Sequence, residues 1–323
     1  MNSIEPIQFL IKEELHAFED IFRRAVKSRV SLLDRIMQYI IKRKGKQMRP
    51  MFVFLSAKLF GPVNESTHRA AALVELLHTA TLVHDDVVDE SFERRGFFSI
   101  NALWKNKVAV LVGDYLLSRG LLLSLKNNDF DVLKILSEAV EKMSEGELLQ
   151  IEKSRSLNLS EEVYFEIIRN KTASLLASAC SAGAWTTTKD VAVAEQMRMF
   201  GEKAGLAFQI KDDLFDYGND AIGKPTGNDI KEKKLTLPLI YTLANVSATK
   251  KRELIYIIKN KNKSKVQVQN VIAEVIKAGG ITYASEKMMR YRDEAIAILS
   301  QFSENEIRNG LEQLVRYTTD RKY

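Results

Sequence analysis

Three aspartates lie together at the end of a long apolar stretch of the sequence. Asp85, Asp86 and Asp89 follow residues 70–83, and Asp85 and Asp89 are four positions apart. On a helix these two side chains share one face, with Cβ atoms about 6 Å apart, and carboxylates so close repel each other. A divalent cation such as Mg²⁺, which prefers oxygen ligands and also binds phosphates, relieves this repulsion. Taken alone, the same spacing also fits a solvated helix end.

A second copy of this spacing occurs far downstream. Asp212, Asp213 and Asp216 again follow an apolar run that contains Ala and Gly. Helical bundles build metal sites from carboxylates that face each other across the interior. The two motifs therefore predict two helix ends that face one another across a cavity and hold metal ions between them.

A basic segment breaks the helical pattern before the first motif. Gly45 interrupts it, and Pro50 suits the first turn of the next helix. Lys46 and Arg49 then lie at a helix N-terminus, where backbone N–H groups already favour anions. The segment is a candidate site for a diphosphate group, although a solvated basic boundary gives the same pattern.

Further candidate ligands for phosphate flank the first aspartate motif. His78 lies two helical turns before Asp85, on roughly the same face, where it is either a core histidine or part of a binding site. Arg94 and Arg95 follow the motif directly. Each guanidinium can bind a phosphate with two hydrogen bonds.

Two other segments carry polar groups that could reach the same cavity. Lys171 and Thr172 lie within a helical pattern, where a surface position is the alternative. The loop at 218–229 contains Lys224 and begins like a phosphate-binding P-loop, but Pro225 replaces the required Ser or Thr, and the preceding element is helical. A nucleotide-binding loop is therefore excluded.

Apolar periodicity and few breakers place these residues on long helices. Among 323 residues there are 15 Gly and 5 Pro, and hydrophobic residues make up 46%, which favours a single all-α domain over residues 1–323. The pattern predicts four or five shorter helices after residue 250. The predicted earlier helices span 4–28, 32–41, 65–90, 102–126, 132–152, 160–184 and 191–217.

Charge, cysteine content and hydropathy limit the classes of protein. The net charge of +6 permits an anionic partner, but no dense basic block with aromatic residues suggests nucleic acid. The single cysteine, Cys180, excludes an intrachain disulfide and suits a reducing compartment. We see neither a signal peptide nor about 18 consecutive apolar residues. We expect a soluble, cytoplasmic protein without a transmembrane segment and a buried, inert thiol.

Together, these motifs resemble those of the trans-type polyprenyl diphosphate synthases. The resemblance runs from about residue 42 to residue 238 and lies in the order of the motifs. They are Gly45-Lys46-x-x-Arg49-Pro50, residues 78–89 with the first aspartates, Arg94-Arg95-Gly96, Gly113-Asp114, Lys171-Thr172, Phe208-Gln209-x-x-Asp212-Asp213 and residues 234–238.

The resemblance implies a fold, a reaction and a set of functional residues. The fold is a helical bundle around a deep central cavity, usually in a homodimer. The reaction is the Mg²⁺-dependent condensation of isopentenyl diphosphate with an allylic prenyl diphosphate. The implied metal ligands are Asp85, Asp89, Asp212 and Asp216, supported by Asp86 and Asp213. The implied allylic site contains Arg94, Lys171, Gln209, Lys224 and Lys234. The implied site for isopentenyl diphosphate contains Lys46, Arg49, His78 and Arg95. Thr172 and Gln209 would stabilise the allylic cation.

The sequence departs from the family pattern in the first basic motif. Lys44 and Gln47 replace a Gly and an Arg of the usual Gly-Gly-Lys-Arg, while Lys46 and Arg49 are retained. We expect isopentenyl diphosphate binding to survive, with an altered loop geometry.

The residues before Asp85 bear on product length. Thr81 and Ala80 lie four and five positions earlier, about one turn deeper. Both are small, whereas in this family bulky aromatic residues there stop elongation early. We therefore expect a long product, in the range of quinone side chains.

Three alternatives remain. A terpene cyclase would normally lack the second aspartate motif and the basic residues Lys46, Arg49 and Arg95. A non-catalytic subunit of a prenyl synthase could lose aspartates that this chain keeps. A nucleic-acid or membrane-surface binder rests on net charge alone.

Overall fold

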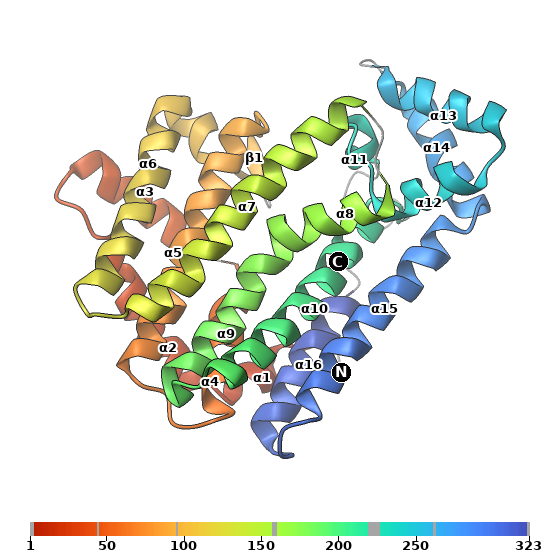
Figure 1. Cartoon of the computed structure of the whole chain (residues 1–323). Helices are drawn as coiled ribbons and strands as arrows, with labels where there is room; N and C mark the ends of the chain where they lie inside the picture. The colour runs from red at the N-terminus through yellow and green to blue at the C-terminus, as the bar shows by residue number, and fades with distance from the viewer. Residues whose placement is uncertain are drawn as a thin grey trace.

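The computed structural model describes residues 3–43, 45–94, 96–156, 160–218, 227–260 and 263–321. It is a bundle of helices with one two-stranded hairpin, so the predicted all-α class is confirmed (Figure 1). The first half contains α1 (Glu5–Phe9), α2 (Lys12–Val26), α3 (Ser31–Lys42), α4 (Met48–Lys58), α5 (Glu65–Val88), β1 (Glu93–Arg94), β2 (Phe97–Phe98), α6 (Ile100–Leu125) and α7 (Phe130–Ser156). The second half contains α8 (Glu161–Ile168), the π-helix η1 (Arg169–Ala173), α9 (Ser174–Thr188), α10 (Val191–Phe215), α11 (Asn228–Lys231), α12 (Leu237–Asn245), α13 (Ala248–Lys259), α14 (Lys265–Lys277), α15 (Gly280–Leu299) and α16 (Glu306–Asp320).

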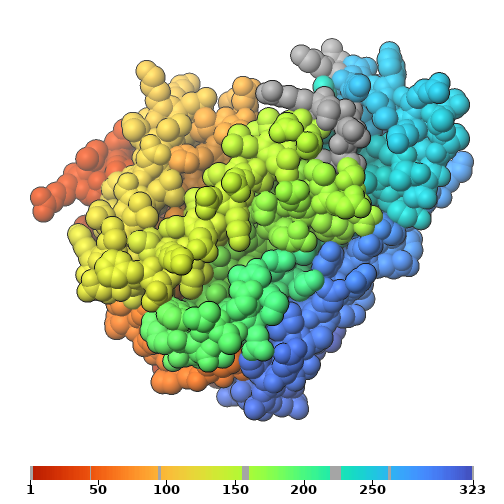
Figure 2. All heavy atoms as spheres, viewed as in Figure 1, coloured from red at the N-terminus to blue at the C-terminus, as the bar shows by residue number. Residues whose placement is uncertain are grey.

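Helix α9 forms the centre of the bundle. Most of its residues are buried, and it packs against α4, α5, α7 and α10. Small residues permit this close packing, because a Cβ at Gly183 would lie 2.4 Å from a backbone oxygen of α4, and one at Gly201 would lie 2.7 Å from the backbone of α9. On the face shown in Figure 2, side chains of α7, α8, α10 and α15 close over this core.

Helices α5 and α6 pack side by side, also through glycine. A Cβ at Gly113 of α6 would lie 2.0 Å from the ring of His84, so only glycine leaves room for that ring. The His84 Nε2 atom lies 3.5 Å from Asp114 Oδ1 and 3.2 Å from the carbonyl oxygen of Val110. The Gly113-Asp114 motif therefore fixes the last turns of α5, which carry the first aspartates, against α6.

Helix α6 is also the one described helix that is long and apolar enough to cross a membrane by length and composition. A third of its most apolar window, 33%, is buried inside the protein. It contains a kink at Lys105 and the charged residues Asp114 and Arg119. The expected absence of a transmembrane segment stays a prediction.

Helix boundaries agree with the sequence where a cap or breaker marks them. Asn64 and Thr67 form a capping box at the start of α5, and Asp190 caps α10 through two backbone N–H groups. Gly45 lies between α3 and α4, and Pro50 lies in the first turn of α4, as predicted. Cys180 is buried, and burial raises the pKa of its thiol to about 12, as expected for an inert cysteine.

Two predicted helices are interrupted. The helix predicted over 4–28 breaks at Leu10 and Ile11, and Ile7 and Ile11 on the two sides of this break are both buried in the core. The helix predicted over 160–184 contains the π-helix η1, which apolar periodicity does not reveal. The single-domain organisation over 1–323 stays a prediction.

Candidate functional site

Both aspartate motifs lie at the C-terminal ends of helices. Asp85 and Asp86 occupy the last turn of α5 and Asp89 is its C-cap, while Asp212 and Asp213 occupy the last turn of α10 and Asp216 is its C-cap. The C-terminal end of a helix carries partial negative charge and disfavours carboxylates. Each motif therefore concentrates negative charge that a bound cation would compensate.

Asp213 is buried within a chain of hydrogen bonds. The Tyr164 hydroxyl donates to its Oδ2 at 2.6 Å, and the Gln209 amide donates to its Oδ1 at 2.8 Å. The Thr172 hydroxyl in turn donates to Gln209 Oε1 at 2.8 Å. Burial raises the pKa of Asp213 to about 7, and the charge of Asp212 adds to this rise, although the two hydrogen bonds oppose it. These hydrogen bonds connect Thr172 and Gln209, the two residues predicted to stabilise the allylic cation, to the second motif.

Asp212 and Asp216 have different partners. Asp212 forms an ion pair with Arg321, the residue after α16. Asp216 accepts hydrogen bonds from the backbone N–H groups of Asn228 at 2.8 Å and Asp229 at 3.1 Å. Asp216 thus anchors the first residues of α11, and its predicted role as a metal ligand stays a prediction.

Lys234 connects the two motifs electrostatically. Burial lowers the pKa of Lys234, but the hydrogen bond to Glu232 at 2.6 Å and the charges of Glu232, Asp229 and Asp89 outweigh this effect and raise it. Its own charge lowers the pKa of Asp213. Lys234 thus interacts electrostatically with Asp89 of the first motif and with Asp213 of the second. That the two motifs face each other across a common cavity stays a prediction.

The carboxylates around the second motif repel one another. Burial raises the pKa of Asp229 to about 8, and the charges of Asp213 and Asp216 raise it further. Such repulsion, together with an all-oxygen donor set, fits a hard divalent cation. Within the described ranges, no three His, Cys, Asp or Glu side chains already converge on one point. The predicted metal site between the two helix ends stays a prediction.

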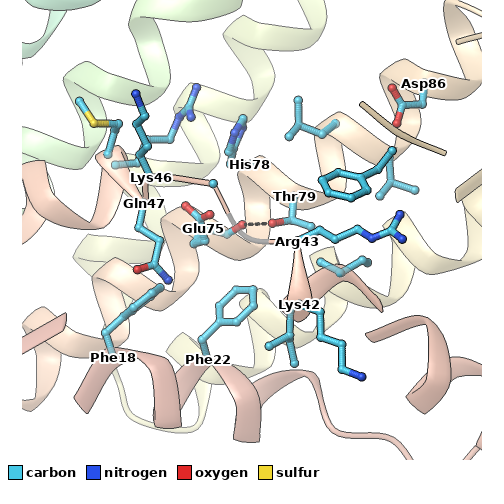
Figure 3. Close-up of a pocket in the computed structure, with 18 of the residues that line it drawn as sticks. Phe18, Phe22, Lys42, Arg43, Lys46, Gln47, Glu75, His78, Thr79 and Asp86 are labelled. Carbon is cyan, nitrogen blue, oxygen red and sulfur yellow. Dashed lines mark hydrogen bonds between the residues drawn. The ribbon is translucent and has the colours of Figure 1, made fainter. Parts of the chain in front are cut away.

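A cavity of about 610 Å³ lies beside the first motif and brings together three of the four residues predicted for isopentenyl diphosphate. Lys46, Arg49 and His78 line it, with Asp86 and Thr172. Phe18 and Phe22 of α2 face the α5 residues across this space (Figure 3). His78 is thus both largely buried and part of the cavity wall. The cavity combines a cationic end with apolar walls, which suits a prenyl diphosphate.

A smaller cavity, of about 140 Å³, is lined by three of the five predicted allylic residues, Lys171, Gln209 and Lys234. Asp213 of the second motif lines it as well. Thr172 lines both cavities and lies where they approach each other. This position suits a group that acts where two substrates meet.

The π-helix η1 places Lys171 and Thr172. Glycines on both neighbouring helices leave room for the wide turn of η1. A Cβ at Gly146 of α7 would lie 2.8 Å from the backbone nitrogen of Lys171, and a Cβ at Gly205 of α10 would lie 2.6 Å from Ala173 Cα. The Lys171 ammonium pairs with Glu147. π-Helical turns are rare and frequent at functional sites.

The hairpin after the first motif contains one of the two predicted arginines. Arg94 lies in β1, whereas Arg95 and Lys224 lie outside the described residues, so the predicted contacts of all three stay predictions. The Tyr39 hydroxyl donates to the Phe98 carbonyl at 2.6 Å and fixes the hairpin on α3. Arg43 lies over the rings of Tyr39 and Phe97, with ring-centre distances of 3.6 and 4.3 Å.

The two predicted chain-length residues do not line either cavity. Ala80 is fully buried in a cluster with Leu76 of α5 and Val112 and Leu116 of α6. The Thr81 hydroxyl donates to the His78 carbonyl at 2.9 Å. The roles of Ala80 and Thr81 in product length stay predictions, and the structure places the first at the α5–α6 contact.

Sequence reasoning missed several residues of the site. Each of these residues lies far in the sequence from the residue with which it interacts. They are Tyr164, Asp229, Tyr317, Arg321 and Glu147. Only Asp229, which follows the Gly- and Pro-rich loop and precedes a run of lysines, had a recognisable sequence signal.

Comparison with known proteins identifies the family. The polyprenyl synthetase family matches residues 30–275. The chain is 35% identical to the all-trans-nonaprenyl-diphosphate synthase (geranyl-diphosphate specific) of Rhodobacter capsulatus over 96% of each chain. It is 30% identical to the octaprenyl diphosphate synthase of Escherichia coli strain K12 over 99% of each.

A solved structure gives the same result. The chain is similar to a polyprenyl synthase of Caulobacter crescentus CB15 with a TM-score of 0.93 and 34% identity, covering 100% of this chain and 99% of the other. That structure contains calcium and isoprenyl diphosphate. The protein belongs to the polyprenyl synthetase family of prenyltransferases, which confirms the resemblance of its motifs.

Proposed function

We propose that the protein elongates prenyl chains: it condenses isopentenyl diphosphate with an allylic prenyl diphosphate, using Mg²⁺, to make a long all-trans polyprenyl diphosphate for a quinone side chain. The proposal is carried by one juxtaposition: Asp86, at the end of α5, lines the larger cavity, Asp213, at the end of α10, lines the smaller one, and Thr172 lines both. The names of the relatives, which include nonaprenyl and octaprenyl diphosphate synthases, support the product class.

The residues around the two cavities divide the work of this reaction. Lys46, Arg49 and His78 bind the diphosphate of the isopentenyl substrate and orient its double bond toward Thr172. Mg²⁺ bound by Asp85, Asp89 and Asp212 would neutralise the leaving diphosphate of the allylic substrate. The oxygens of Thr172 and Gln209 stabilise the positive charge that develops on the allylic carbon.

The reaction breaks one bond, forms another and releases one proton. The allylic C–O bond breaks, the double bond of the isopentenyl group forms the new C–C bond, and one proton leaves the condensed product. The released diphosphate is the base, because the buried carboxyl group of Asp213 is already hydrogen-bonded by Tyr164 and Gln209. The apolar walls of the larger cavity exclude water, which would otherwise capture the cation.

A product assay tests the proposal. Purified protein is incubated with isopentenyl and farnesyl diphosphates and Mg²⁺, with and without chelator, and product length is read by mass spectrometry. We expect a metal-dependent series that ends at one long species. Asp85→Asn should abolish it, whereas Asp20→Asn, at an exposed position of α2, should not.

The opposite result would also be informative. If farnesyl, geranyl and geranylgeranyl diphosphates all give no elongated product, the protein is a terpene cyclase or a subunit that requires a partner. Cyclised products from the same starters would identify the first, and restored elongation on addition of a second chain would identify the other.

The proposed enzyme is a homodimer in the cytoplasm. Support for the dimer comes from α6 and α7, on which Leu111 and Leu148 expose 68% and 67% of their surface. Val110, Leu121, Leu122 and Leu125 of α6 are exposed as well. Apolar patches of this kind mark protein contacts. Light scattering of the wild type and of Leu111→Lys tests the dimer, which the substitution should weaken.

A further inference from the structure

The turn that ends α16 contacts both parts of the site. Tyr317 accepts a hydrogen bond from the Lys46 ammonium at 2.5 Å, and Arg321, four residues later, pairs with Asp212. The first partner belongs to the proposed isopentenyl diphosphate site and the second to the proposed metal site. The end of α16 therefore holds the positively charged guanidinium of Arg321 against the second aspartate motif.

Several contacts hold the Arg321 guanidinium in this position. It lies over the rings of Phe208 and Phe215, with ring-centre distances of 4.5 and 5.2 Å, and its Nε donates to the Thr318 carbonyl at 3.1 Å. The turn is also tied to α15, because Arg292 lies 3.7 Å from Asp320. The guanidinium is thus positioned by the fold and is not a freely moving surface group.

The ion pair between Arg321 and Asp212 is nevertheless weak enough for another cation to replace the guanidinium. The Asp212 side chain is 40% exposed and that of Arg321 is 21% exposed, and ion pairs at such positions are weak. A divalent ion that carries twice the charge and binds Asp212 directly can displace the guanidinium.

We propose that Arg321 is a positioning residue that acts as the resident counter-charge of Asp212, so that a divalent metal must displace its guanidinium to bind the second aspartate motif. This inference rests on the metal role proposed for Asp212. It implies that the turn after α16 sets the metal affinity of the enzyme and keeps the Asp212 side chain oriented before metal arrives.

Metal binding without turnover tests this inference. Mn²⁺ affinity is measured by electron paramagnetic resonance on the full chain, without substrates, for the wild type and for Arg321→Gln, Arg321→Lys and Arg316→Gln. We expect Arg321→Gln to bind Mn²⁺ about two- to tenfold more tightly. Arg321→Lys keeps the charge and should stay near the wild type. Arg316→Gln is the matched control, since Arg316 lies on the same helix and pairs with Glu312.

A double-mutant cycle separates the pair from a general effect of charge. In the Asp212→Asn background, Arg321→Gln should change Mn²⁺ affinity less than twofold. An Mn²⁺ affinity that is unchanged or weaker in Arg321→Gln overturns the inference, and so does the absence of measurable Mn²⁺ binding to either protein. An equal gain in Arg316→Gln or in the Asp212→Asn background also overturns it. Because no product is measured, these outcomes are distinct from a failure of the proposed elongation.

Discussion

The Thr172 hydroxyl and the Gln209 side-chain oxygen lie 2.8 Å apart and join the π-helix η1 to α10. The amide nitrogen of Gln209 donates to Asp213, so the Gln209 oxygen faces Thr172. The hydrogen bond therefore fixes the orientation of two oxygens near the junction of the two cavities, where the proposed allylic cation develops.

Loss of the Thr172 hydroxyl should lower the rate of elongation. In Thr172→Val the Gln209 oxygen loses its donor, and we expect kcat to fall about tenfold, the effect of one hydrogen bond made near the transition state. Steady-state kinetics with saturating substrates measures this change. Thr172→Ser keeps the hydroxyl and should retain most of the rate, and an equal loss in both variants would contradict the role of the hydrogen bond.

The close approach of Gly146 to the π-helix gives a second prediction. A methyl group at Gly146 would lie 2.8 Å from the Lys171 nitrogen and 2.9 Å from Asn170 Cβ. Gly146→Ala should therefore displace η1, cost about 1–3 kcal/mol of stability and lower kcat at least tenfold. Thermal unfolding and kinetics measure the two effects.

Alanine is otherwise the better helix former, so the sign of this effect is diagnostic. Gly61→Ala, at a position between α4 and α5, is the control for the added methyl group alone, because the nearest atom to that group is 3.8 Å away. If Gly146→Ala stabilised the protein and left kcat unchanged, the geometry of η1 would not matter for the reaction.

Much of the fold could be predicted because its signals are local. The apolar runs before Asp85 and Asp212 predict two helices whose ends carry the carboxylates, and α5 and α10 do so. Prediction from apolar periodicity fails at Leu10 and at η1, where it predicts continuous α-helices. In both places, packing against distant helices decides the backbone conformation, and apolar periodicity records only which residues are buried.

The partners of the site residues could not be predicted for a related reason. Arg321 lies 109 positions from Asp212, and Tyr317 lies 271 positions from Lys46. A basic residue near the end of a helix has the sequence pattern of a solvent-exposed position, and this pattern does not indicate which distant carboxylate it pairs with. The aspartates could be assigned because their types and spacing limit the chemistry, whereas an arginine suits many environments.

Ala80 gives a prediction about product length. The residue belongs to α5 and is fully buried in a cluster that also contains Val112 and Leu116 of α6. We expect a growing prenyl tail to pass between these helices, so the ring in Ala80→Phe should block it and shorten the main product by several isoprene units. Mass spectrometry of the products measures this change, and an unchanged length distribution would exclude Ala80 from the tail path.

The control for Ala80→Phe is a residue on the wall of the larger cavity. Thr79 lines that cavity and lies next to Ala80 in sequence. Thr79→Phe should weaken isopentenyl diphosphate binding and raise its KM while leaving product length close to that of the wild type. Unfolding temperatures of both variants show whether the added ring, which can cost about 1–3 kcal/mol in a packed core, destabilises the fold.

The raised pKa values of Asp213 and Asp229 predict how the metal-free protein responds to pH. Burial and neighbouring carboxylates raise them to about 7 and about 8, above the ordinary value of 3.8. Between pH 4 and these values the folded state binds more protons than the unfolded chain, so stability falls as pH rises. With a chelator present, the unfolding temperature should therefore decrease from pH 5 to pH 8. Asp229→Asn removes one of these groups and should reduce the slope.

A carboxyl group with the opposite shift is the control for this pH dependence. Burial alone would raise the pKa of Asp129, but hydrogen bonds from Arg69 and Ser66 outweigh it and lower the pKa. The stability that Asp129 contributes is present above its unfolded pKa and is lost only as pH falls through its lowered folded value. Asp129→Asn should thus lower the unfolding temperature equally at pH 5 and pH 8, without changing the slope. The same slope in Asp229→Asn and the wild type would show that Asp229 is ionised throughout this range, and that the repulsion proposed to recruit the metal is absent there.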